Sequence, residues 1–282
     1  MDKRQAALQR VERSINRREI DLDTSNEVAM ANKMILHCAC NLNLNELKLL
    51  RLIIMQTKKG DKEFFEFELS MKDFADILGV NVKSHNLYRN VDKMTTHIMQ
   101  EVIAIYNGDD FKKFHWVDYC EHGRGKIRIK IADALKPYLL NLRGSFTRYE
   151  LDEIIKLNSV YAIRIYEILR SFMNDKDLPY ADHNNVISIN MDVLRKATGT
   201  EKKFERFSNF KAKVIDTAVN EINRCSKYHV TAEPYKDGNK IVGFDFLIES
   251  QAGYDHRQQQ EQKTIDDQIE GQMFITDFIK PQ

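Results

Sequence analysis

Seven lysine and arginine side chains fall between positions 195 and 213, where only Glu201 and Glu205 carry the opposite charge. The basic residues are Arg195, Lys196, Lys202, Lys203, Arg206, Lys211 and Lys213. Such a dense cluster attracts phosphate groups, because salt screens charges beyond about 8 Å and only neighbouring side chains act together. Lysine, arginine and the nearby Asn209 can also pair with the edges of bases. The pattern favours contact with nucleic acid over a merely solvated surface.

The composition is that of an ordinary globular protein with two domains. The chain has 282 residues, 43% of them hydrophobic, and its 11 glycines and 4 prolines leave room for long regular elements. The net charge of +1 hides an uneven distribution, because residues from 249 onward carry seven acids and three bases. No apolar run has membrane-spanning length, and the N-terminus lacks the apolar core of a secretory signal. We therefore expect a cytosolic protein.

The sequence lacks the residue patterns of an ATPase and of a rolling-circle nuclease, so we expect neither catalytic residues nor a cofactor. Gly123-Arg124-Gly125-Lys126 has neither the spacing nor the hydroxyl of an ATP-binding loop. No His-x-His pair is present, which a rolling-circle nuclease would need beside its tyrosine. Asp109 and Asp110 are adjacent carboxylates, but they fall at the tip of a predicted turn, where a solvated hairpin is the simpler interpretation.

The cysteines do not indicate a metal site. Cys38-Ala39-Cys40 is the one close pair among four cysteines, and its spacing is not that of common zinc sites. His37, Cys120 and His122 could be recruited to such a site. Reduced and mostly buried thiols are the expectation for a cytosolic chain.

The elements that must position the basic cluster occur twice in the chain. Leu69-Ser70-Met71-x-x-Phe74-x-x-x-x-Gly79 aligns without a gap on Ile189-Asn190-Met191-x-x-Leu194-x-x-x-x-Gly199. Serine and asparagine are good N-caps, because their side-chain oxygens accept hydrogen bonds from free amides of the first helical turn. Glycine suits the residue that follows a helix end. Each copy therefore predicts a strand, a short capped helix and a glycine stop.

A second helix and a hairpin follow each glycine. In the second copy the helix covers about 209–224, and strands 228–233 and 240–248 turn at Asp237-Gly238. In the first copy the helix covers about 84–100, and the hairpin 101–119 turns at Asn107-Gly108. Chance could make two amphipathic segments look alike, but caps, glycines and turns agree in order. The predicted fold class is α+β, with two tandem pseudo-repeated winged-helix domains, a helical N-terminal extension and a disordered C-terminal tail.

The predicted domains are a charged helical extension at 1–25, a first winged helix at 26–143, a second at 144–250 and a flexible acidic tail at 251–282. The extension could pack on the first domain, lie on DNA or project as a solvated helix. Residues 132–150 place apolar side chains at helical spacing, so the joint should be packed, whereas 251–271 should be disordered or weakly helical. Gln272, Ile275 and Phe278 loosely resemble a sliding-clamp-binding peptide. A tail that docks on its own body explains them as well.

Two stretches resemble the replication initiator (Rep) proteins of theta-replicating, iteron-containing bacterial plasmids. Residues 158–169 match the family pattern Ser-x-Tyr-Ala-x-Arg-x-Tyr-Glu-x-Leu, and residues 207–223 match its basic helix ending in Ala-Val-x-Glu-Ile-Asn. The similarity covers about 28–249 and is weaker in the first half. It implies two pseudo-repeated winged helices, the fold that the internal repeat predicts independently.

The resemblance also implies a function in the bacterial cytoplasm. Such a protein binds direct repeats in double-stranded DNA at a plasmid origin, promotes opening of nearby A·T-rich duplex and recruits host helicase and initiator proteins. The second module would dominate binding, while the first would touch the adjacent groove and serve in dimerisation; as a dimer the protein would repress its own promoter. The alternative is a winged-helix transcriptional regulator without an initiation role, which would use a single operator and a sensory pocket.

The expected DNA contacts follow from helix–turn–helix geometry, in which the second helix enters the major groove. We expect Lys202 and Lys203 to bind phosphate and Arg206, Lys211 or Lys213 to read bases. The other expected contacts are Asn209, Lys236 and Lys240 in the second module, and Lys83, His85, Asn86, Arg89 and Lys93, with Asp110 and Lys112 as weaker candidates, in the first.

Overall fold

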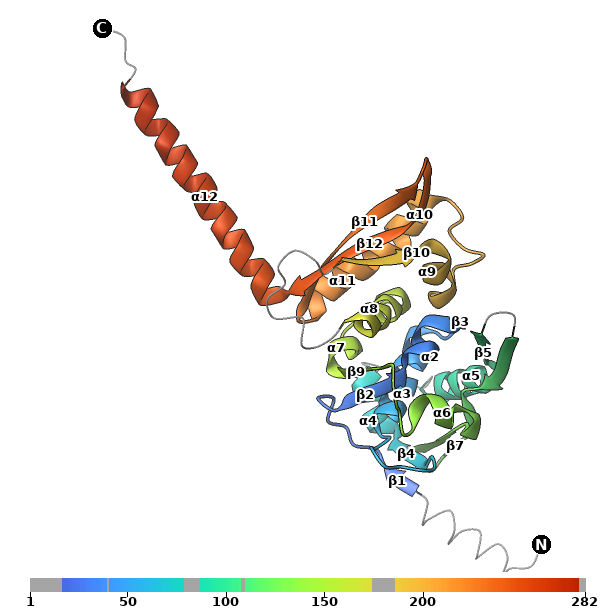
Figure 1. Ribbon diagram of the computed structural model, residues 1–282. Helices are drawn as coiled ribbons and strands as arrows, with labels where there is room; N and C mark the ends of the chain where they lie inside the picture. Colours follow the sequence, from blue (N-terminus) through green and yellow to red (C-terminus); the bar gives the residue numbers. More distant parts are fainter. Residues whose placement is uncertain (1–16, 40, 79–86, 108–109, 174–185, 279–282) are drawn as a thin grey trace, which may run out of the picture.

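Two winged-helix modules lie one above the other, with a central helix between them (Figure 1). The computed structural model of the chain describes residues 17–39, 41–78, 87–107, 110–173 and 186–278. The buried side chains of both modules and of the central helix form one continuous hydrophobic core. The two predicted winged helices are therefore present, and their cores merge across the joint.

The second module has one three-stranded sheet with its helices packed against it. Its elements are β10 (Val186–Asn190), α9 (Met191–Ala197), α10 (Phe207–Phe210), the π-helical turn η2 (Lys211–Asp216), α11 (Thr217–Cys225), β11 (Tyr228–Asp237) and β12 (Lys240–Ser250). β12 pairs antiparallel with β10 on one side and β11 on the other. Asn190 caps α9 by accepting a hydrogen bond from the Asp192 amide at 2.8 Å, and Gly199 follows with a φ of 63°. The predicted cap and glycine stop are confirmed.

The first module repeats this topology. Its corresponding elements are β4 (Glu66–Ser70), α4 (Met71–Leu78), α5 (Leu87–Gln100), β7 (Val117–Gly123) and β8 (Lys126–Ile131). β8 pairs antiparallel with β4 and β7, as β12 pairs with β10 and β11. The Ser70 hydroxyl accepts a hydrogen bond from the Asp73 amide at 3.0 Å, so the predicted N-cap is present here too. Gly79 lies outside the described residues.

The wing of the first module is not the hairpin that the sequence predicted. The predicted strands do pair, but β5 (Val102–Asn107) and β6 (Asp110–His115) form a separate sheet with β3 (Cys38–Ala39). The wing is β7–β8, because only this hairpin pairs with β4 among the described residues. The prediction was wrong because a local turn signal does not say which distant strand a hairpin will join.

The joint between the modules is packed, as predicted from residues 132–150. It is built from β2 (Glu27–Ala31), α2 (Asn32–His37), α3 (Leu44–Met55), η1 (Asp133–Leu135), α6 (Lys136–Leu139), β9 (Phe146–Glu150), α7 (Asp152–Ile155) and α8 (Val160–Phe172). β9, which the sequence assigned to the second domain, pairs antiparallel with β2 of the first. The helix α8 contacts β9 and α2 on one side and α9 and α11 on the other, so it belongs to both halves of the core.

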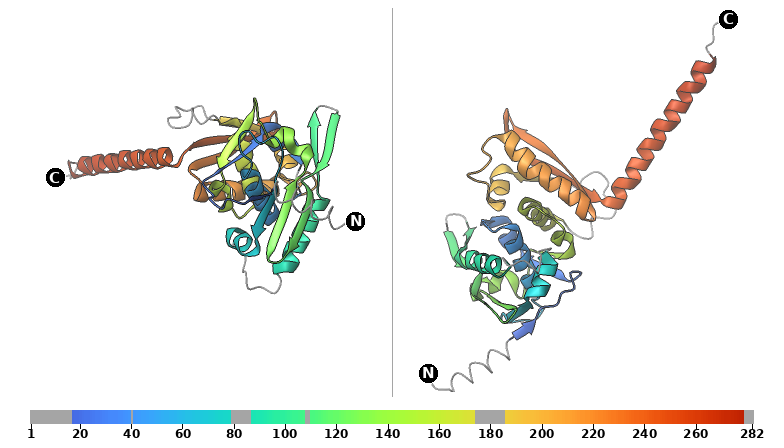
Figure 2. Two further views of the ribbon diagram at one scale, coloured as in Figure 1. Left: turned by 90° about the horizontal axis from the view of Figure 1, so that it is seen from below. Right: turned by 180° about the vertical axis from the view of Figure 1, so that it is seen from behind.

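The N-terminal end of the described chain does not have the expected form. Residues 17–25 were expected in a charged helix, but Arg17–Glu19 form strand β1, which pairs in parallel with β4. The Arg18 guanidinium also pairs with Asp61 at 2.8 Å. At the other end the tail, expected to be disordered or weakly helical, is the helix α12 (Gln251–Phe278), which projects away from the body (Figures 1 and 2). Its start is held by the stack of Tyr254 on His229, with ring centroids 3.4 Å apart.

Candidate nucleic-acid interface

The turn after α9 presents the first part of the basic cluster to solvent. Lys202, Lys203 and Arg206 are exposed, whereas Thr198 and Thr200 are buried beneath them and share a hydrogen bond of 2.8 Å between their hydroxyls. The turn thus has a fixed interior and a cationic rim. Such a rim can bind phosphates without rearrangement of the backbone.

Arg195 is a structural residue of this turn, although its charge placed it in the basic cluster. Its guanidinium donates to the carbonyl oxygens of Thr200, Lys203 and Phe204 at 3.2, 2.9 and 3.0 Å. It also lies over the Phe210 ring, 4.4 Å from the centroid. The Thr200 carbonyl also accepts a hydrogen bond from the Lys203 amide at 3.0 Å, and Phe204 takes a left-handed φ of 53°. Arg195 therefore shapes the surface on which Lys202 and Lys203 stand.

The second helix of this module buries one side and exposes the other. The sequence places five apolar residues at helical spacing along it. Phe210, Val214, Ala218 and Ile222 are fully buried, and Phe207 is half-buried. Asn209 and Lys213 are exposed on the outer side, near the N-terminal end. The sequence therefore placed these two side chains where a double helix could reach them.

A π-helical turn in this helix changes the position of Lys211. The wider turn at Lys211–Asp216 brings residues five apart together, and the Lys211 ammonium lies 2.6 Å from the Asp216 carboxylate. Both side chains are more than a third exposed, so the pair contributes little to stability and can exchange for a phosphate partner. The π-turn was not expected from the sequence, since its helical periodicity matches an ordinary α-helix.

The wing of the second module carries two more exposed cations. Lys236 and Lys240 flank the hairpin tip, where Gly238 has a φ of 60°. Below the tip, Tyr235 covers Gly243 so closely that a Cβ there would lie 2.4 Å from its ring. The glycine is required for this contact, which gives the wing a rigid base.

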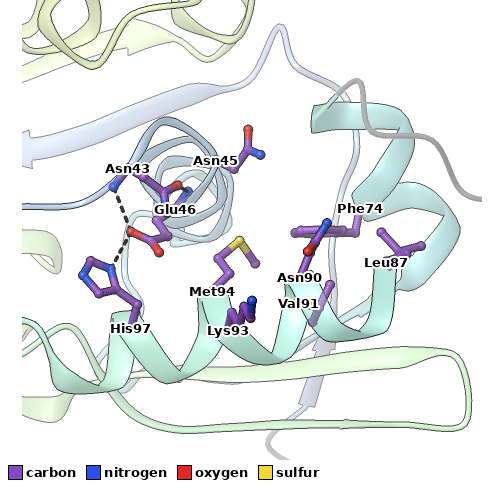
Figure 3. A pocket seen from close by; sticks show the side chains of 10 residues that line it. All are labelled: Asn43, Asn45, Glu46, Phe74, Leu87, Asn90, Val91, Lys93, Met94 and His97. Atoms are coloured by element: carbon purple, nitrogen blue, oxygen red, sulfur yellow. Dashed lines mark hydrogen bonds and ion pairs between the residues drawn. The ribbon is translucent and has the colours of Figure 1, made fainter. Parts of the chain in front are cut away.

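The first module offers a thinner set of contacts. Arg89 and Lys93 are exposed on α5, while Lys83, His85 and Asn86 lie outside the described residues. A pocket of about 410 Å³ opens between α5 and the start of α3 (Figure 3). Its floor is Phe74, Leu87, Val91 and Met94, its end is closed by His97 and Glu46, 2.9 Å apart, and its rim carries Asn45, Asn90 and Lys93.

Sequence reasoning missed Arg124 at the tip of the corrected first wing. It is exposed and adopts a left-handed φ of 52° between Gly123 and Gly125. The strand after it, Lys126–Ile131, alternates polar and apolar residues, and this was the available signal. Lys112 is exposed on β6, as expected, but the hairpin that carries it is not the wing.

A second pocket, of about 340 Å³, connects the two modules along this side. It is lined by Asn41, Leu42 and Asn43 of the first module and by Lys203 and Gly199 of the second, with Val160, Tyr161 and Thr198. Asn43 also lines the pocket beside α5. The turn of the second module and α5 of the first therefore border one continuous surface.

The remaining candidates give no further site. Gln272, Ile275 and Phe278 lie in the last turns of α12, where the side chains are outside the described set. Within the described residues no three histidines, cysteines or acids are grouped to hold a metal. Burial raises the pKa of the Cys120 thiol to about 12, which leaves it unreactive. The helices that the structure describes include none with the length and apolar character to cross a membrane.

Two family models match successive parts of the chain. The family model described as Initiator Replication protein, WH1, matches residues 27–170, and Initiator Rep protein, WH2, matches 190–248. A Replication initiation protein of Escherichia coli is 23% identical over 172 residues, 60% of this chain and 52% of the relative. The PI protein of Escherichia coli is 25% identical over 157 residues, 50% of this chain and 49% of the relative. The chain thus spans about half the length of these curated relatives.

A solved structure shares the fold over most of its length. The crystal structure of Pi initiator protein in complex with iteron DNA aligns with a TM-score of 0.64 and 17% identity, covering 81% of this chain and 98% of that chain. The WH1 model alone matches half of the chain, and the WH2 model follows at the second winged helix. The chain therefore belongs to the Initiator Replication protein family, whose two winged helices account for its internal repeat.

Proposed function

We propose that this chain is a plasmid replication initiator that binds repeated sites in double-stranded DNA through both winged helices. The proposal rests on exposed polar side chains on the turn after α9 and on the outer side of the helix that follows it. These side chains are Lys202, Lys203, Arg206, Asn209 and Lys213. In a helix–turn–helix this part of the molecule meets the major groove. The Pi initiator protein, which shares the fold, was crystallised with iteron DNA, and this supports the same ligand class here.

The roles of individual side chains follow from their positions. Lys202 and Lys203 bind phosphates, because they stand on the rim of a turn with a rigid interior. Arg206, Asn209 and Lys213 read base edges, and Lys211 joins them when DNA displaces Asp216. The cations of the second wing, Lys236 and Lys240, and those of the first module, Arg89, Lys93 and Arg124, follow the backbone on either side.

The wider function rests on family membership. In the bacterial cytoplasm the protein promotes opening of A·T-rich DNA beside its repeats and recruits host helicase and initiator proteins. It dimerises through the first module and represses its own promoter in that form. It acts by binding, without a catalytic step of its own. A contact of Gln272, Ile275 and Phe278 with the sliding clamp remains part of the proposal.

Fluorescence anisotropy with labelled duplexes tests the core of this proposal. We expect several copies of the protein to bind a duplex carrying the direct repeats beside its own gene, and a scrambled duplex of equal length to bind at least about a thousandfold more weakly. Binding to one operator alone would favour the alternative function, that of a winged-helix transcriptional regulator without an initiation role. Equal affinity for both duplexes would contradict sequence-specific initiation.

A further inference from the structure

The family signature on α8 places three buried polar residues where the two modules meet. Arg164, Tyr166 and Glu167 are at most 2% exposed, and Arg51 of α3 is 1% exposed. Glu167 accepts hydrogen bonds from Arg51 at 2.5 and 3.1 Å, from Arg164 at 2.6 Å and from the Tyr149 hydroxyl at 2.6 Å. None of these side chains lines the DNA-facing pockets, so the proposed DNA contacts do not explain them.

Arg164 bonds to both modules with one guanidinium. Its Nε donates to the carbonyl oxygen of Ala197 at the end of α9, at 3.0 Å, and its Nη2 donates to that of Ile35 near the end of α2, at 2.8 Å. Helices end with unpaired carbonyls and partial negative charge, which a cation stabilises. The planar guanidinium can satisfy both ends only when α2 and α9 keep one relative orientation.

The chain segments that follow these two carbonyl groups form part of the candidate interface. The residues after Ala197 form the turn that presents Lys202 and Lys203, and those after Ile35 lead to Asn41 and Asn43. A shift of α9 against α2 would therefore move the DNA-binding turn of the second module relative to the first module. Glu167 in turn holds Arg164, because it is anchored on the opposite side by Arg51 of the first module.

We propose that Arg164 and Glu167 are positioning residues, and that the buried cluster sets the spacing between the two DNA segments that the winged helices bind. This inference rests on the proposed function. With a rigid joint, both modules reach their grooves only at one separation. With a loosened joint, each module still binds, but sites of several separations become acceptable.

Spacing variants of the target provide the test. Two base pairs inserted between the segments contacted by the two modules rotate one of them by about 70° and move it by about 7 Å. We expect wild-type protein to bind the natural repeat at least about tenfold better than the insertion, since one module loses its contacts. R164M should bind the natural repeat more weakly and prefer it less than about threefold. L50A is the control, because it removes a buried side chain of α3 that makes no hydrogen bond between the modules; it should lose stability and keep the wild-type preference.

Several results would overturn the proposal. Folded R164M with the wild-type spacing preference contradicts it, as does wild-type protein that tolerates the insertion. If R164M does not fold, R164K keeps the charge without the planar guanidinium. An unchanged spacing preference in R164K would contradict the proposal equally. A wild-type chain that binds no repeat would refute the proposed function; amide hydrogen exchange then tests the joint alone. R164M should exchange faster than wild type in both 34–39 and 196–204, L50A should not do so in 196–204, and equal rates in R164M and wild type contradict the joint.

Discussion

The Nη1 atom of Arg195 lies 2.9 Å from the carbonyl oxygen of Lys203, so one basic residue of the cluster shapes the turn while its neighbour faces solvent. The same charge therefore has two uses within nine positions. A count of charged residues does not distinguish these two roles, whereas the hydrogen bonds do. The distinction leads to opposite expectations for their replacement.

Replacing Arg195 by methionine should reduce both stability and DNA binding. Its bonds to three carbonyl groups would be lost, at a cost of about 1–3 kcal/mol in the free energy of unfolding. Thermal melting followed by circular dichroism measures the loss. An R195M variant with the wild-type melting temperature would show that the turn does not depend on this residue.

Replacing Lys203 by alanine should weaken binding without changing the melting temperature. Loss of one phosphate contact flattens the plot of log affinity against log salt by about 0.9, while sequence preference stays the same. Lys156, exposed on the joint near α7, provides a control whose replacement should leave the slope unchanged. An unchanged slope for K203A would remove Lys203 from the interface.

Arg124→Ala tests the corrected first wing. We expect weaker binding and the loss of hydroxyl-radical protection at one edge of each repeat, because the wing tip follows the backbone. Lys112→Ala is the matched control on the neighbouring hairpin, and should leave this edge protected. The reverse pattern would restore the β5–β6 hairpin as the wing.

Stability should fall in acid because of Glu167. Burial alone would raise the pKa of this carboxyl, but the charges of Arg51 and Arg164 outweigh it and lower the pKa from 4.5 to about 2. A depressed pKa in the folded state stabilises the protein above pH 4.5, and this stabilisation is lost as the pH falls toward 2. The loss is roughly 3 kcal/mol. Urea unfolding at pH 5 and pH 3 measures about 2 kcal/mol of this loss, because pH 3 still lies above the pKa of the folded state. In E167Q, which starts less stable, the decrease should be smaller, and an equal decrease would contradict the assignment.

The sequence predicted those features of the fold that depend on neighbouring residues. Asn190 and Gly199 signalled the ends of α9, and the stripe from Phe210 to Ile222 signalled a buried helix side, because caps and periodicity are local properties. Features that depend on distant partners were missed. Nothing near Lys126 shows that its strand pairs with β4, and nothing near Arg18 shows that residues 17–19 pair with the same strand.

The candidate site also has features that the sequence predicted and features that it did not. Exposure of Asn209 and Lys213 follows from their place opposite an apolar stripe, and that of Lys202 and Lys203 from their place in a charged turn. The pairing of Lys211 with Asp216 requires a π-turn, which leaves the sequence period almost unchanged.

Asp216→Asn should free Lys211 and raise affinity for DNA several-fold, most strongly at low salt. Titrations at two salt concentrations measure the gain, and weaker binding of D216N would show that the pair itself supports the interface.

Hydroxyl-radical footprinting on the plasmid's direct repeats tests the central claim most directly. If both winged helices bind the duplex, each repeat should show protection in two successive grooves on one face, and K202A/K203A should lose the protection that belongs to the second module. Protection confined to one groove, or an unchanged pattern in the double variant, would contradict the account.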